Sequence, residues 1–573
     1  MRLTSLEILN FRGIHEANLR FPHSKRLLCI IGAGDSCKTT LLKAIEWCLW
    51  PSYSLLATDS DFYNCDTSNP ILIRASIAEI PEELTREEKY GLYLRDSDSV
   101  LSGLENDEPT DTGVPVITIQ LAIDENLEPN WSVITNRSDS KPITQKDRRL
   151  LAFGVIGTDF DKDFQWGKNS VLQRYSNSSR DSLHSAYTQA MRLAVANTDL
   201  SDLDSMAGKL TEIGRKYGVS FNGVLHNRLL MQNGSYSSNV GVYDDNVPFV
   251  QRGLGSKRLF SMGMNISVSE GVSLILIDEV ETGLEPYRIC TLINELRNVS
   301  KTKGQIIMTT HSRSTICECN AEELLVMNCS NGIAKLQAFE DLTIKSSIQG
   351  MLRANPDAFL CKRLIVCEGK TEIGVLRACD SYLDNSSNVK FAHFGTSTAL
   401  GNGGNSTFKL ARVLKEYGYD VCILMDSDRD DEIAEKKALE SEGIAVFSWD
   451  PGYSIEEQIF HDATSDVAEK MIMAAVEIKS FDHVCAKMSG AFPDTKPYTI
   501  EGNSIKLNTP VTEETLVRIG KIAKSEAWFK RIDFGQQIGE IIFDEYDEFV
   551  GKTFRCVIER LLQWVMSNET QGN

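Results

Sequence analysis

The feature that most constrains the fold is an apolar run that leads into a glycine loop near the start of the chain. Residues 27–31 are Leu-Leu-Cys-Ile-Ile, which is typical of a buried central strand. The next residues, Gly32 to Thr39, read Gly-Ala-Gly-Asp-Ser-Cys-Lys-Thr, and we expect an apolar helix from Leu41 to Trp50. Backbone N–H groups of such a loop can wrap phosphate, and the helix N-terminus adds positive potential. The segment therefore predicts an α/β sheet with a phosphate-binding loop; an ordinary tight βα turn is the alternative.

The residues of this loop have separate expected roles. Lys38 is expected to contact the β- and γ-phosphates of a nucleotide, and Thr39 to ligate Mg²⁺. The P-loop pattern has glycine where this chain has Cys37, whose side chain narrows the loop. We expect that departure to affect the rate of hydrolysis more than nucleotide binding. The other nucleotide-binding candidates here are Gly32, Gly34 and Thr40.

A second apolar run ends in two acids, which is the pattern of a Walker B segment. Residues 274–277 are followed by Asp278 and Glu279. Asp278 is expected to hold Mg²⁺ through water, and Glu279 to activate the attacking water. The alternative is a buried strand followed by two surface acids. Downstream, the strand that ends at Thr310 is followed by His311, where ABC-type ATPases place a histidine that senses the γ-phosphate.

Two further segments complete an ordered set. Residues 252–258, Arg-Gly-Leu-Gly-Ser-Lys-Arg, resemble the ABC signature, whose serine, here Ser256, contacts ATP bound to a partner subunit. A glycine turn with basic neighbours is the alternative. Residues 9–13, which include Arg12, resemble the first strand and turn of RecF- and SMC-like heads. The order of these elements predicts an ABC-type ATPase head.

The C-terminal half contains another pair of strands that end in acids. Residues 364–367 lead to Glu368, and a glycine turn precedes Glu372. Residues 421–425 lead to the acids Asp426, Asp428 and Asp430. Acids at the carboxyl ends of two parallel strands can converge at one edge of a sheet. Hard oxygen ligands suit Mg²⁺ or Mn²⁺, and such ions can assist phosphodiester cleavage, whereas the alternative is a solvated acidic loop.

This Glu…Asp-x-Asp arrangement is the TOPRIM signature. Glu368 and Glu372 lie four residues apart, hence on one face of a helical turn, so Glu372 could help to hold a second ion. Glu456, with Glu457 as the competing choice, is a further candidate ligand or simply a helix N-terminal acid favoured by the dipole. Lys530 follows two aromatic residues and is a candidate cation for the transition state, or else a surface lysine.

Composition limits the class of protein. The formal net charge of −20 argues against a generally basic nucleic-acid coat, so any DNA contact should be local. No apolar run approaches the roughly 20 residues needed to span a bilayer, and no membrane association is expected. The 14 cysteines include no CxxC pair, which favours free thiols in a reducing cytoplasm.

Changes in periodicity give the expected domain boundaries. Strand signals give way to helical periodicity after about residue 179, and they return in the second half, including 391–394 and 444–448. The expected fold is α/β throughout: 1–178, N-terminal part of the ATPase; 179–235, helical insertion for dimerisation; 236–355, C-terminal part of the ATPase; 356–465, TOPRIM nuclease domain; 466–573, a mainly helical region that completes the nuclease module.

The order of motifs along the whole chain resembles the OLD (overcoming lysogenization defect) family of ATP-dependent endonucleases, which includes nucleases of the Gabija and some retron antiphage systems. The resemblance implies ATP, a DNA substrate, and a homodimer or homotetramer. It also implies a defence partner, either a helicase-like protein or a reverse transcriptase with its msDNA. It implies two Mg²⁺ or Mn²⁺ ions, with Lys530 as supporting lysine, on Glu368, Glu372, Asp426, Asp428 and Glu456.

Other functions remain as alternatives. The first is a RecF-like ATP-gated DNA-binding protein whose TOPRIM domain is structural. A primase or topoisomerase is disfavoured, because the chain offers neither a zinc-type cysteine spacing nor a separate breakage domain. A long-armed SMC protein is excluded by the short distance between the Walker motifs.

Overall fold

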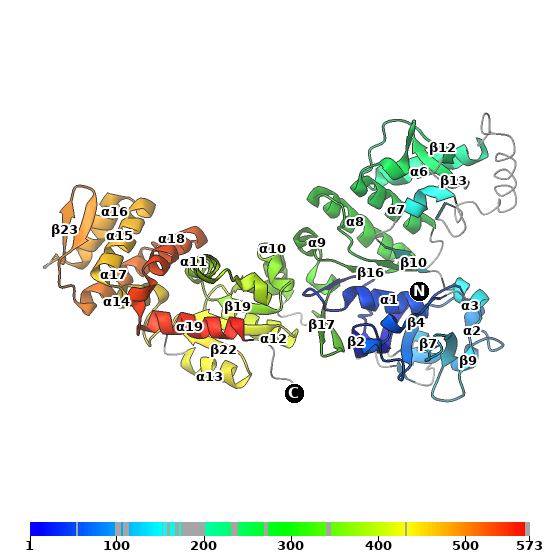
Figure 1. The fold of residues 1–573 in the computed structure, drawn as a ribbon, viewed down its shortest axis with the longest axis horizontal. Coiled ribbons are helices and arrows are strands. Elements are labelled where there is room, and N and C mark those ends of the chain that lie inside the picture. Colours follow the sequence, from blue (N-terminus) through cyan, green and yellow to red (C-terminus); the bar gives the residue numbers. More distant parts are fainter. Residues whose placement is uncertain are drawn as a thin grey trace. The chain divides into compact units, whose positions relative to one another are not determined.

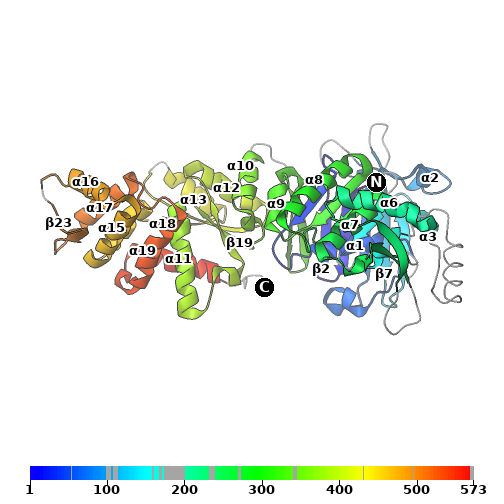
Figure 2. The ribbon, with the colours of Figure 1, turned by 90° about the horizontal axis from the view of Figure 1, so that it is seen from above.

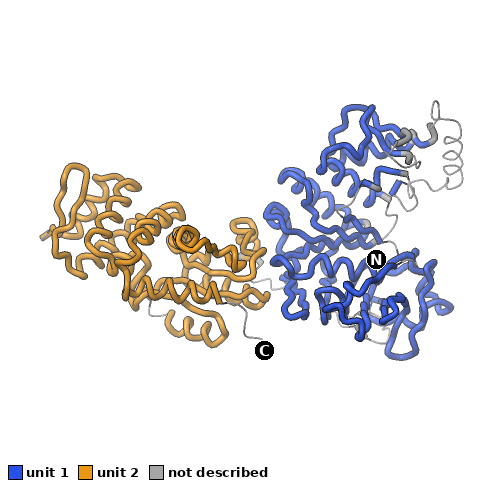
Figure 3. Tube along the Cα trace, in the orientation of Figure 1, with its two compact units in different colours: residues 1–345 blue, residues 346–573 orange. Residues whose placement is uncertain are grey.

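The structure is a computed structural model, and it describes residues 1–52, 55–97, 105–106, 114–151, 153–157, 161–166, 171–172, 201–230, 239–268, 273–339, 345–429, 432–494 and 496–567. The chain divides into two compact units, residues 1–345 and 346–573 (Figure 3). Within the described ranges, no helix is long and apolar enough to cross a membrane.

A mixed sheet is the framework of the first unit (Figure 1). Its parallel half has the order β10 (Phe153–Ile156), β15 (Ser273–Ile277), β16 (Gly304–Thr309), β3 (Leu27–Ile31) and β17 (Leu324–Ser330). The sheet continues through β18 (Ile333–Ala338), β2 (Ile14–Arg20), β1 (Arg2–Phe11), β4 (Ile71–Ala78) and β7 (Val114–Ile123). Beyond β7 lie β5 (Arg95–Ser97), β6 (Glu105–Asn106), β8 (Pro129–Ile134) and β9 (Lys141–Pro142).

The two halves of this sheet differ in burial, as their sequences do. β3 is apolar throughout and buried at every position, because both faces of a parallel sheet are covered. β2 alternates between buried and exposed residues, which is typical of an antiparallel strand with one solvated face. The helices of this unit include α1 (Lys38–Cys48), α3 (Gln145–Leu150), α7 (Leu254–Val268), α8 (Pro286–Lys303) and α9 (Arg313–Glu318).

The helical insertion expected at 179–235 is described only in part, because residues 179–200 and 231–235 lie outside the described residues. Helix α6 (Ser201–Lys216) agrees with the expectation. The expected helical periodicity is wrong at β12 (Leu225–Leu230), which pairs antiparallel with β13 (Asn239–Asp244). The rings of His226 and Tyr243 stack across that pair, and such cross-strand packing overrides a weak local helical preference.

The second unit begins with a four-stranded parallel sheet in its described part, ordered β20 (Thr396–Leu400), β19 (Arg363–Cys367), β21 (Asp420–Met425) and β22 (Ala445–Ser448). Its helices include α11 (Lys370–Ser387), α12 (Gly404–Glu416), α13 (Ile433–Ser441) and α14 (Ile455–Asp462). The strand expected at 391–394 is wrong: these residues form a 3₁₀ turn. Gly395, with φ of 61°, closes that turn, and the strand begins one residue later.

The end of the chain is mainly helical: α15 (Ser465–Lys479), α16 (Phe481–Ala491), α17 (Glu513–Ser525), α18 (Ile532–Asp544) and α19 (Thr553–Met566). A short hairpin, β23 (Tyr498–Glu501) with β24 (Ser504–Leu507), interrupts it. Within this unit, α15, α16 and α17 gather with β23 at one end, and the sheet that contains β19 lies at the other (Figure 1, Figure 2).

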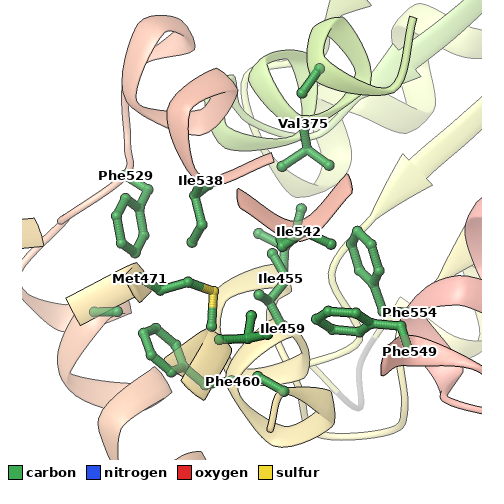
Figure 4. Packing of buried hydrophobic residues seen from close by; sticks show 14 of the residues in the cluster. Val375, Ile455, Ile459, Phe460, Met471, Phe529, Ile538, Ile542, Phe549 and Phe554 are labelled. Carbon is green, nitrogen blue, oxygen red and sulfur yellow. The ribbon is translucent and has the colours of Figure 1, made fainter. Parts of the chain in front are cut away.

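One apolar core joins these helices to the parallel sheet (Figure 4). It contains Val375 of α11, Ile455 of α14, Ile538 of α18 and Phe554 of α19, together with Phe529 from the segment before α18. Complete burial of a side chain of this size contributes roughly 1.5–3 kcal/mol. The C-terminal helices are therefore part of the same folding unit as β19 and β21, and they hold residues 528–531 in a fixed place beside the sheet.

Candidate active sites

The phosphate loop of the first unit turns at Gly32. This residue has φ of 147°, and a β carbon on it would lie 2.4 Å from the carbonyl oxygen of Met327. Only glycine fits such a position. Gly34 is exposed, and a β carbon there would meet nothing within 4 Å. Thr40 lies half-buried in the first turn of α1.

Lys38 is folded back over this loop. Its Nζ donates to the carbonyl oxygens of Gly32 (3.0 Å) and Ala33 (2.8 Å), and to Oγ of Ser36 (3.0 Å). Burial lowers the pKa of Lys38 to about 8, and the nearby carboxylate of Asp35 opposes that shift. A bound phosphate would therefore have to replace the hydrogen bonds that this ammonium group makes within the loop.

The Walker B acids lie beside this lysine at the end of β15. Oδ1 of Asp278 accepts from the hydroxyls of Thr39 (3.3 Å) and Thr309 (2.6 Å), so the P-loop threonine and this acid meet as expected. Glu279 has φ of 46°, and its N–H donates to Oγ1 of Thr309 (2.9 Å). Arg258 of α7 donates to the carbonyl oxygens of both acids, at 2.5 and 3.2 Å.

Arg258 is a residue that sequence reasoning missed. Its side chain is fully buried, and burial lowers its pKa to about 10. By binding the carbonyl groups behind Asp278 and Glu279, it fixes the turn that aims both carboxylates. The sequence did contain a hint of this role, because Arg258 stands next to Leu259 and Phe260 in an apolar helix. An arginine buried in such a helix needs hydrogen-bond partners.

His311 belongs to the same cluster. Its N–H donates to Oε1 of Glu281 (2.6 Å), and Oγ1 of Thr310 donates to the other oxygen of that carboxylate (2.6 Å). Burial lowers the pKa of His311, and the positive charge of Lys38 lowers it further. The ends of β3, β15 and β16 therefore bring together Lys38, Thr39, Asp278, Glu279 and His311.

Two predicted residues lie outside this cluster. Arg12 binds Asp61 through Nε and Nη2, both at 2.9 Å, and its guanidinium lies over the rings of Phe11 and Trp47. It therefore anchors the first turn of the sheet. Ser256 lies half-buried in the first turn of α7.

Cys37 caps α1 in a left-handed conformation, with φ of 64°. Such a conformation costs a side-chain-bearing residue roughly 1–2 kcal/mol. Its thiol contacts Gly13, where a β carbon would lie 2.9 Å from Sγ, and it is hydrogen-bonded to the thiol of Cys329. That hydrogen bond raises the pKa of Cys37 and lowers the pKa of Cys329 to about 7.

In the second unit, the strand ends that carry the acids are tied together by Glu368. Its N–H donates to the carbonyl oxygen of Leu424 (3.0 Å), which continues the pairing of β19 with β21. Its carboxylate accepts from the N–H groups of Asp426 (3.0 Å) and Gly404 (3.3 Å). The acids of the two strands therefore meet at one edge of the sheet, as the sequence predicted.

Three more carboxyl groups lie around this point, of which Glu372 and Glu456 are buried and Asp426 is half-buried. Asp426 accepts from the N–H of Ile455 (2.8 Å), Glu372 from the N–H of Gly369 (3.0 Å), and Glu456 from the hydroxyl of Thr371 (3.2 Å). Burial raises all three pKa values, that of Glu372 to about 8. The mutual repulsion of these carboxylates raises the pKa values of Glu372 and Asp426 further.

These side chains line a cavity of about 380 Å³. It is bordered by Glu368, Gly369, Lys370, Thr371, Glu372, Leu400, Asn402, Gly403, Asp426, Glu456, Lys524 and Lys530. Of the two adjacent acids of α14, Glu456 borders the cavity, whereas Glu457 caps its own helix by accepting from the N–H of Ser454 (2.9 Å). Asp430 lies outside the described residues.

Lys524 is a second residue that sequence reasoning missed. A β carbon on Gly520 would lie 2.7 Å from Cα of Glu457, so α17 and α14 touch at their backbones. One turn later, Nζ of Lys524 donates to Oδ2 of Asp428 (2.5 Å) and to Oε2 of Glu457 (3.4 Å). In the sequence, the hint of this contact was Gly520 within an amphipathic helix, because a glycine there can mark the close approach of another backbone.

Lys530 is also brought to the cavity by close helix packing at a glycine. A β carbon on Gly374 of α11 would lie 2.4 Å from the carbonyl oxygen of Ile532, so α18 packs directly on α11. Trp528 and Phe529 are fully buried, whereas Lys530 is exposed at the rim of the cavity. Its charge lowers the pKa of Glu456, against the effect of burial.

The donor set fits hard divalent cations. Carboxylate oxygens are the ligands that Mg²⁺ and Mn²⁺ prefer, and the raised pKa values indicate that the protein alone does not stabilise the charged form of these carboxyl groups. Across the described ranges, no three His, Cys, Asp or Glu side chains are already placed to hold an ion. The reason is visible in the hydrogen bonds of Glu372 and Asp426 to backbone N–H groups, and in the ion pair of Asp428.

Comparison with known proteins identifies the N-terminal region. Residues 116–318 match the family described as "AAA domain, putative AbiEii toxin, Type IV TA system", and residues 5–202 match a second family described as "AAA domain". No curated protein matches the chain. The first unit is therefore similar to ATPase domains of the AAA type, and ATP binding is implied for it.

Solved structures with similarity include heads of SMC proteins. One is an SmcHead bound to the C-winged helix domain of ScpA (13% identity, TM-score 0.36, 59% of this chain and 98% of that one). Another is the Smc head with an extended coiled coil bound to the C-terminal domain of ScpA, derived from Pyrococcus furiosus (14%, 0.37, 61% and 99%). A third is the SMC head domain from Thermotoga maritima (14%, 0.30, 60% and 100%).

Proposed function

We propose that the protein is a metal-dependent DNA endonuclease in which an ABC-type ATPase regulates a TOPRIM phosphodiesterase site. The observation that carries this proposal is the cavity of the second unit. There, half-buried Glu368 and Asp426 from two parallel strand ends, buried Glu372 of α11 and buried Glu456 of α14 border the same cavity as two lysines. A buried cluster of like charges is costly for folding, which favours a functional explanation.

The residues that would hold divalent ions are Glu368, Glu372, Asp426, Asp428 and Glu456. When bound, such ions activate water and stabilise the leaving oxygen of a phosphodiester. Lys530 would place a positive charge beside the phosphate, where negative charge develops in the transition state. Lys524 holds Asp428 and Glu457 in position, and α14 keeps Asp426 oriented through the N–H of Ile455.

The first unit would bind and hydrolyse ATP. Lys38 would leave its loop carbonyls for the β- and γ-phosphates, and Thr39 with Asp278 would hold the Mg²⁺ of the nucleotide. Glu279 would act as general base for the attacking water. We infer that the state of the nucleotide governs access of DNA to the acidic cavity.

We further propose membership of the OLD family and a role in antiphage defence, which the order of the motifs along the chain supports. That assignment implies a cytoplasmic homodimer or homotetramer, and a partner such as a helicase-like protein or a retron reverse transcriptase with its msDNA. The alternative is a RecF-like ATP-gated DNA-binding protein without nuclease activity. The ion pair between Lys524 and Asp428 favours that alternative, because it occupies one of the expected ligands.

Cleavage of supercoiled plasmid by the full-length protein, in Mg²⁺ or Mn²⁺ and with or without ATP, tests the proposal. We expect Glu368→Ala and Asp426→Ala each to abolish detectable cleavage, because the ions that would activate water and stabilise the leaving oxygen lose a ligand. Cleavage that persists in either variant would overturn the assignment. DNA binding by a wild-type protein that never cleaves would establish the RecF-like alternative.

A further inference from the structure

A second hollow lies beside the acidic cavity of the second unit. It has a volume of about 470 Å³ and is lined by Tyr453, Glu513, Glu514, Val517, Arg518 and Lys521. All of these except Tyr453 belong to α17, and Tyr453 lies two residues before α14. None of the predicted site residues lies in this groove, which we call the α17 groove.

The α17 groove adjoins the acidic cavity through two connections. Lys521 lines the groove and Lys524 borders the cavity, and residues three apart lie on the same face of a helix. The carbonyl oxygen of Tyr453 accepts from the N–H of Ser427 (2.9 Å), the residue between Asp426 and Asp428. A chain of nucleotides that left the cavity along α17 would therefore enter the groove directly.

Charge along α17 changes from acidic to basic in the direction of the cavity. Arg518 and Lys521 are exposed, and no acid of the described ranges forms an ion pair with either; the guanidinium of Arg518 lies over the ring of Phe492, 5.1 Å from its centroid. Glu513 is already bound by Nε2 of His461 (2.5 Å). Glu514 lies one turn before Arg518 on the same face of α17, at the far end of the groove, and ten residues, or about 15 Å along the helix axis, before Lys524. The end of the groove nearest the cavity is thus the one that attracts phosphate.

Tyr453 supplies an aromatic face at this groove. Its ring is half-buried and lies 5.3 Å from the ring of His461. His461 is itself held by the buried carboxylate of Asp462, at 2.8 Å. An aromatic ring beside exposed cations is the combination that binds single-stranded nucleic acid, since phosphates meet the cations and a base stacks on the ring.

We propose that the α17 groove binds one unpaired strand of DNA next to the phosphodiester to be cleaved. Backbone phosphates meet Arg518 and Lys521, and a base stacks on Tyr453. This inference rests on the proposed nuclease function, because it assigns a strand to the groove that adjoins the acidic cavity. It also predicts that unpaired DNA is preferred to a continuous duplex, whose bases are unavailable for stacking.

The test uses the full-length protein and a fluorescent single-stranded oligonucleotide, with EDTA present so that binding is measured without cleavage. We expect the double variant Arg518→Ala/Lys521→Ala to lower the slope of log affinity against log salt by about 1.4, because each phosphate that the protein no longer neutralises removes about 0.7. Tyr453→Ala should weaken binding roughly fivefold to 150-fold. Arg518→Lys/Lys521→Arg, which keeps both charges, should restore the slope.

A matched control separates this site from general electrostatics. Lys409→Ala/Lys506→Ala removes two exposed lysines from other elements of the same unit and should leave the slope unchanged. An equal decrease of slope in the control, or none in the groove variant, overturns the groove while plasmid cleavage by the wild type still supports the nuclease. If the wild type binds through the groove but cleaves no DNA, the groove stands and the proposed nuclease fails.

Discussion

The nucleotide site of the first unit and the acidic cavity of the second satisfy their charged groups in opposite ways. In the first, Lys38 is bonded to its own loop and Asp278 accepts from two threonine hydroxyls. In the second, buried Glu372 and half-buried Asp426 lie among other carboxylates that raise their pKa values. The first site is internally paired, whereas in the second the charged forms of the carboxyl groups are destabilised and favour protonation.

This difference indicates which interactions a ligand must replace or supply at each site. A nucleotide must compete with the bonds that Lys38 already makes, so part of its binding free energy is used to open the loop. A cation at the acidic cavity replaces no internal salt bridge at Glu372 or Asp426, and it removes repulsion between them. We therefore expect binding at the second site to stabilise the fold much more than binding at the first.

The largest expected effect is on ATP hydrolysis at the nucleotide site of the first unit. Glu279→Gln should reduce ATP hydrolysis by roughly 10²- to 10⁴-fold, the usual contribution of a general base, while ATP binding and thermal stability stay near wild type. Steady-state phosphate release and nucleotide titration measure both. Glu285→Gln is the matched control, since Glu285 is exposed and forms its ion pair with Arg288 across one helical turn. Equal hydrolysis in Glu279→Gln and wild type would remove Glu279 from the mechanism.

The second prediction concerns stability without metal. Asp426→Asn removes a half-buried carboxyl group whose charged form its neighbours repel, so at a pH where the carboxyl groups of the cavity are ionised we expect the metal-free protein to gain about 1–3 kcal/mol. That gain corresponds to a rise in Tm of roughly 2–4 °C per kcal/mol for a unit of this size. Mg²⁺ should raise Tm in the wild type and much less in the variant.

Thermal melts in EDTA and in Mg²⁺ provide this measurement. The exposed Asp482 of α16 offers the control substitution, Asp482→Asn, which should change neither quantity. A lower metal-free Tm in Asp426→Asn than in the wild type would mean that the carboxylates of the cavity are not mutually repulsive, and the contrast between the two sites would disappear.

The third prediction is a pH dependence with a definite sign. The pKa of Glu372 is raised from 4.5 to about 8, so between these values the folded protein binds more protons than the unfolded chain. In EDTA, this group therefore makes the free energy of unfolding fall as pH rises from about 4.5 to about 8, by at most about 1.4 kcal/mol per pH unit. Urea unfolding across this range measures the slope. Glu372→Gln should flatten it; an unchanged slope would assign the effect to other groups.

The smallest effect concerns the thiol pair of the phosphate loop. Cys329 should be alkylated with a midpoint near pH 7, because its pKa is lowered by the hydrogen bond from Cys37. In Cys37→Gly that midpoint should move upward towards an ordinary thiol value of about 8.5. The glycine should also relieve about 1 kcal/mol of backbone strain at this left-handed position.

Mass spectrometry of the peptide that contains Cys329, after timed reaction with iodoacetamide, gives the midpoint without interference from other thiols. The exposed Cys556 in the same digest is the internal reference. A midpoint that stays near pH 7 in Cys37→Gly would show that Cys37 does not control Cys329.

The strands that end in the candidate site residues could be predicted from the sequence more accurately than the segments around them. Residues 27–31, 363–367 and 421–425 form strands because continuous apolar runs have few alternatives in a parallel sheet. The strand predicted at 391–394 was wrong, because a left-handed glycine at 395 ends a 3₁₀ turn there. The helical prediction for 225–230 was wrong, because those residues pair with a neighbouring strand.

The same division holds for the sites. Acids at strand ends could be placed from sequence, since the sheet itself brings Glu368 and Asp426 together. Lys524 and Arg258 could not, because they reach their partners through helix packing between distant parts of the chain. Where a helix packs depends on close contacts, such as the one at Gly520, that no local pattern specifies.

The most direct test of the central claim is to measure Mn²⁺ binding and plasmid cleavage on the same preparations of the wild type and Asp426→Asn. We expect wild-type cleavage to rise with the same Mn²⁺ dependence as binding, and the variant to show neither. If Asp426→Asn bound Mn²⁺ and cleaved plasmid like the wild type, the acidic cavity would not be the nuclease site.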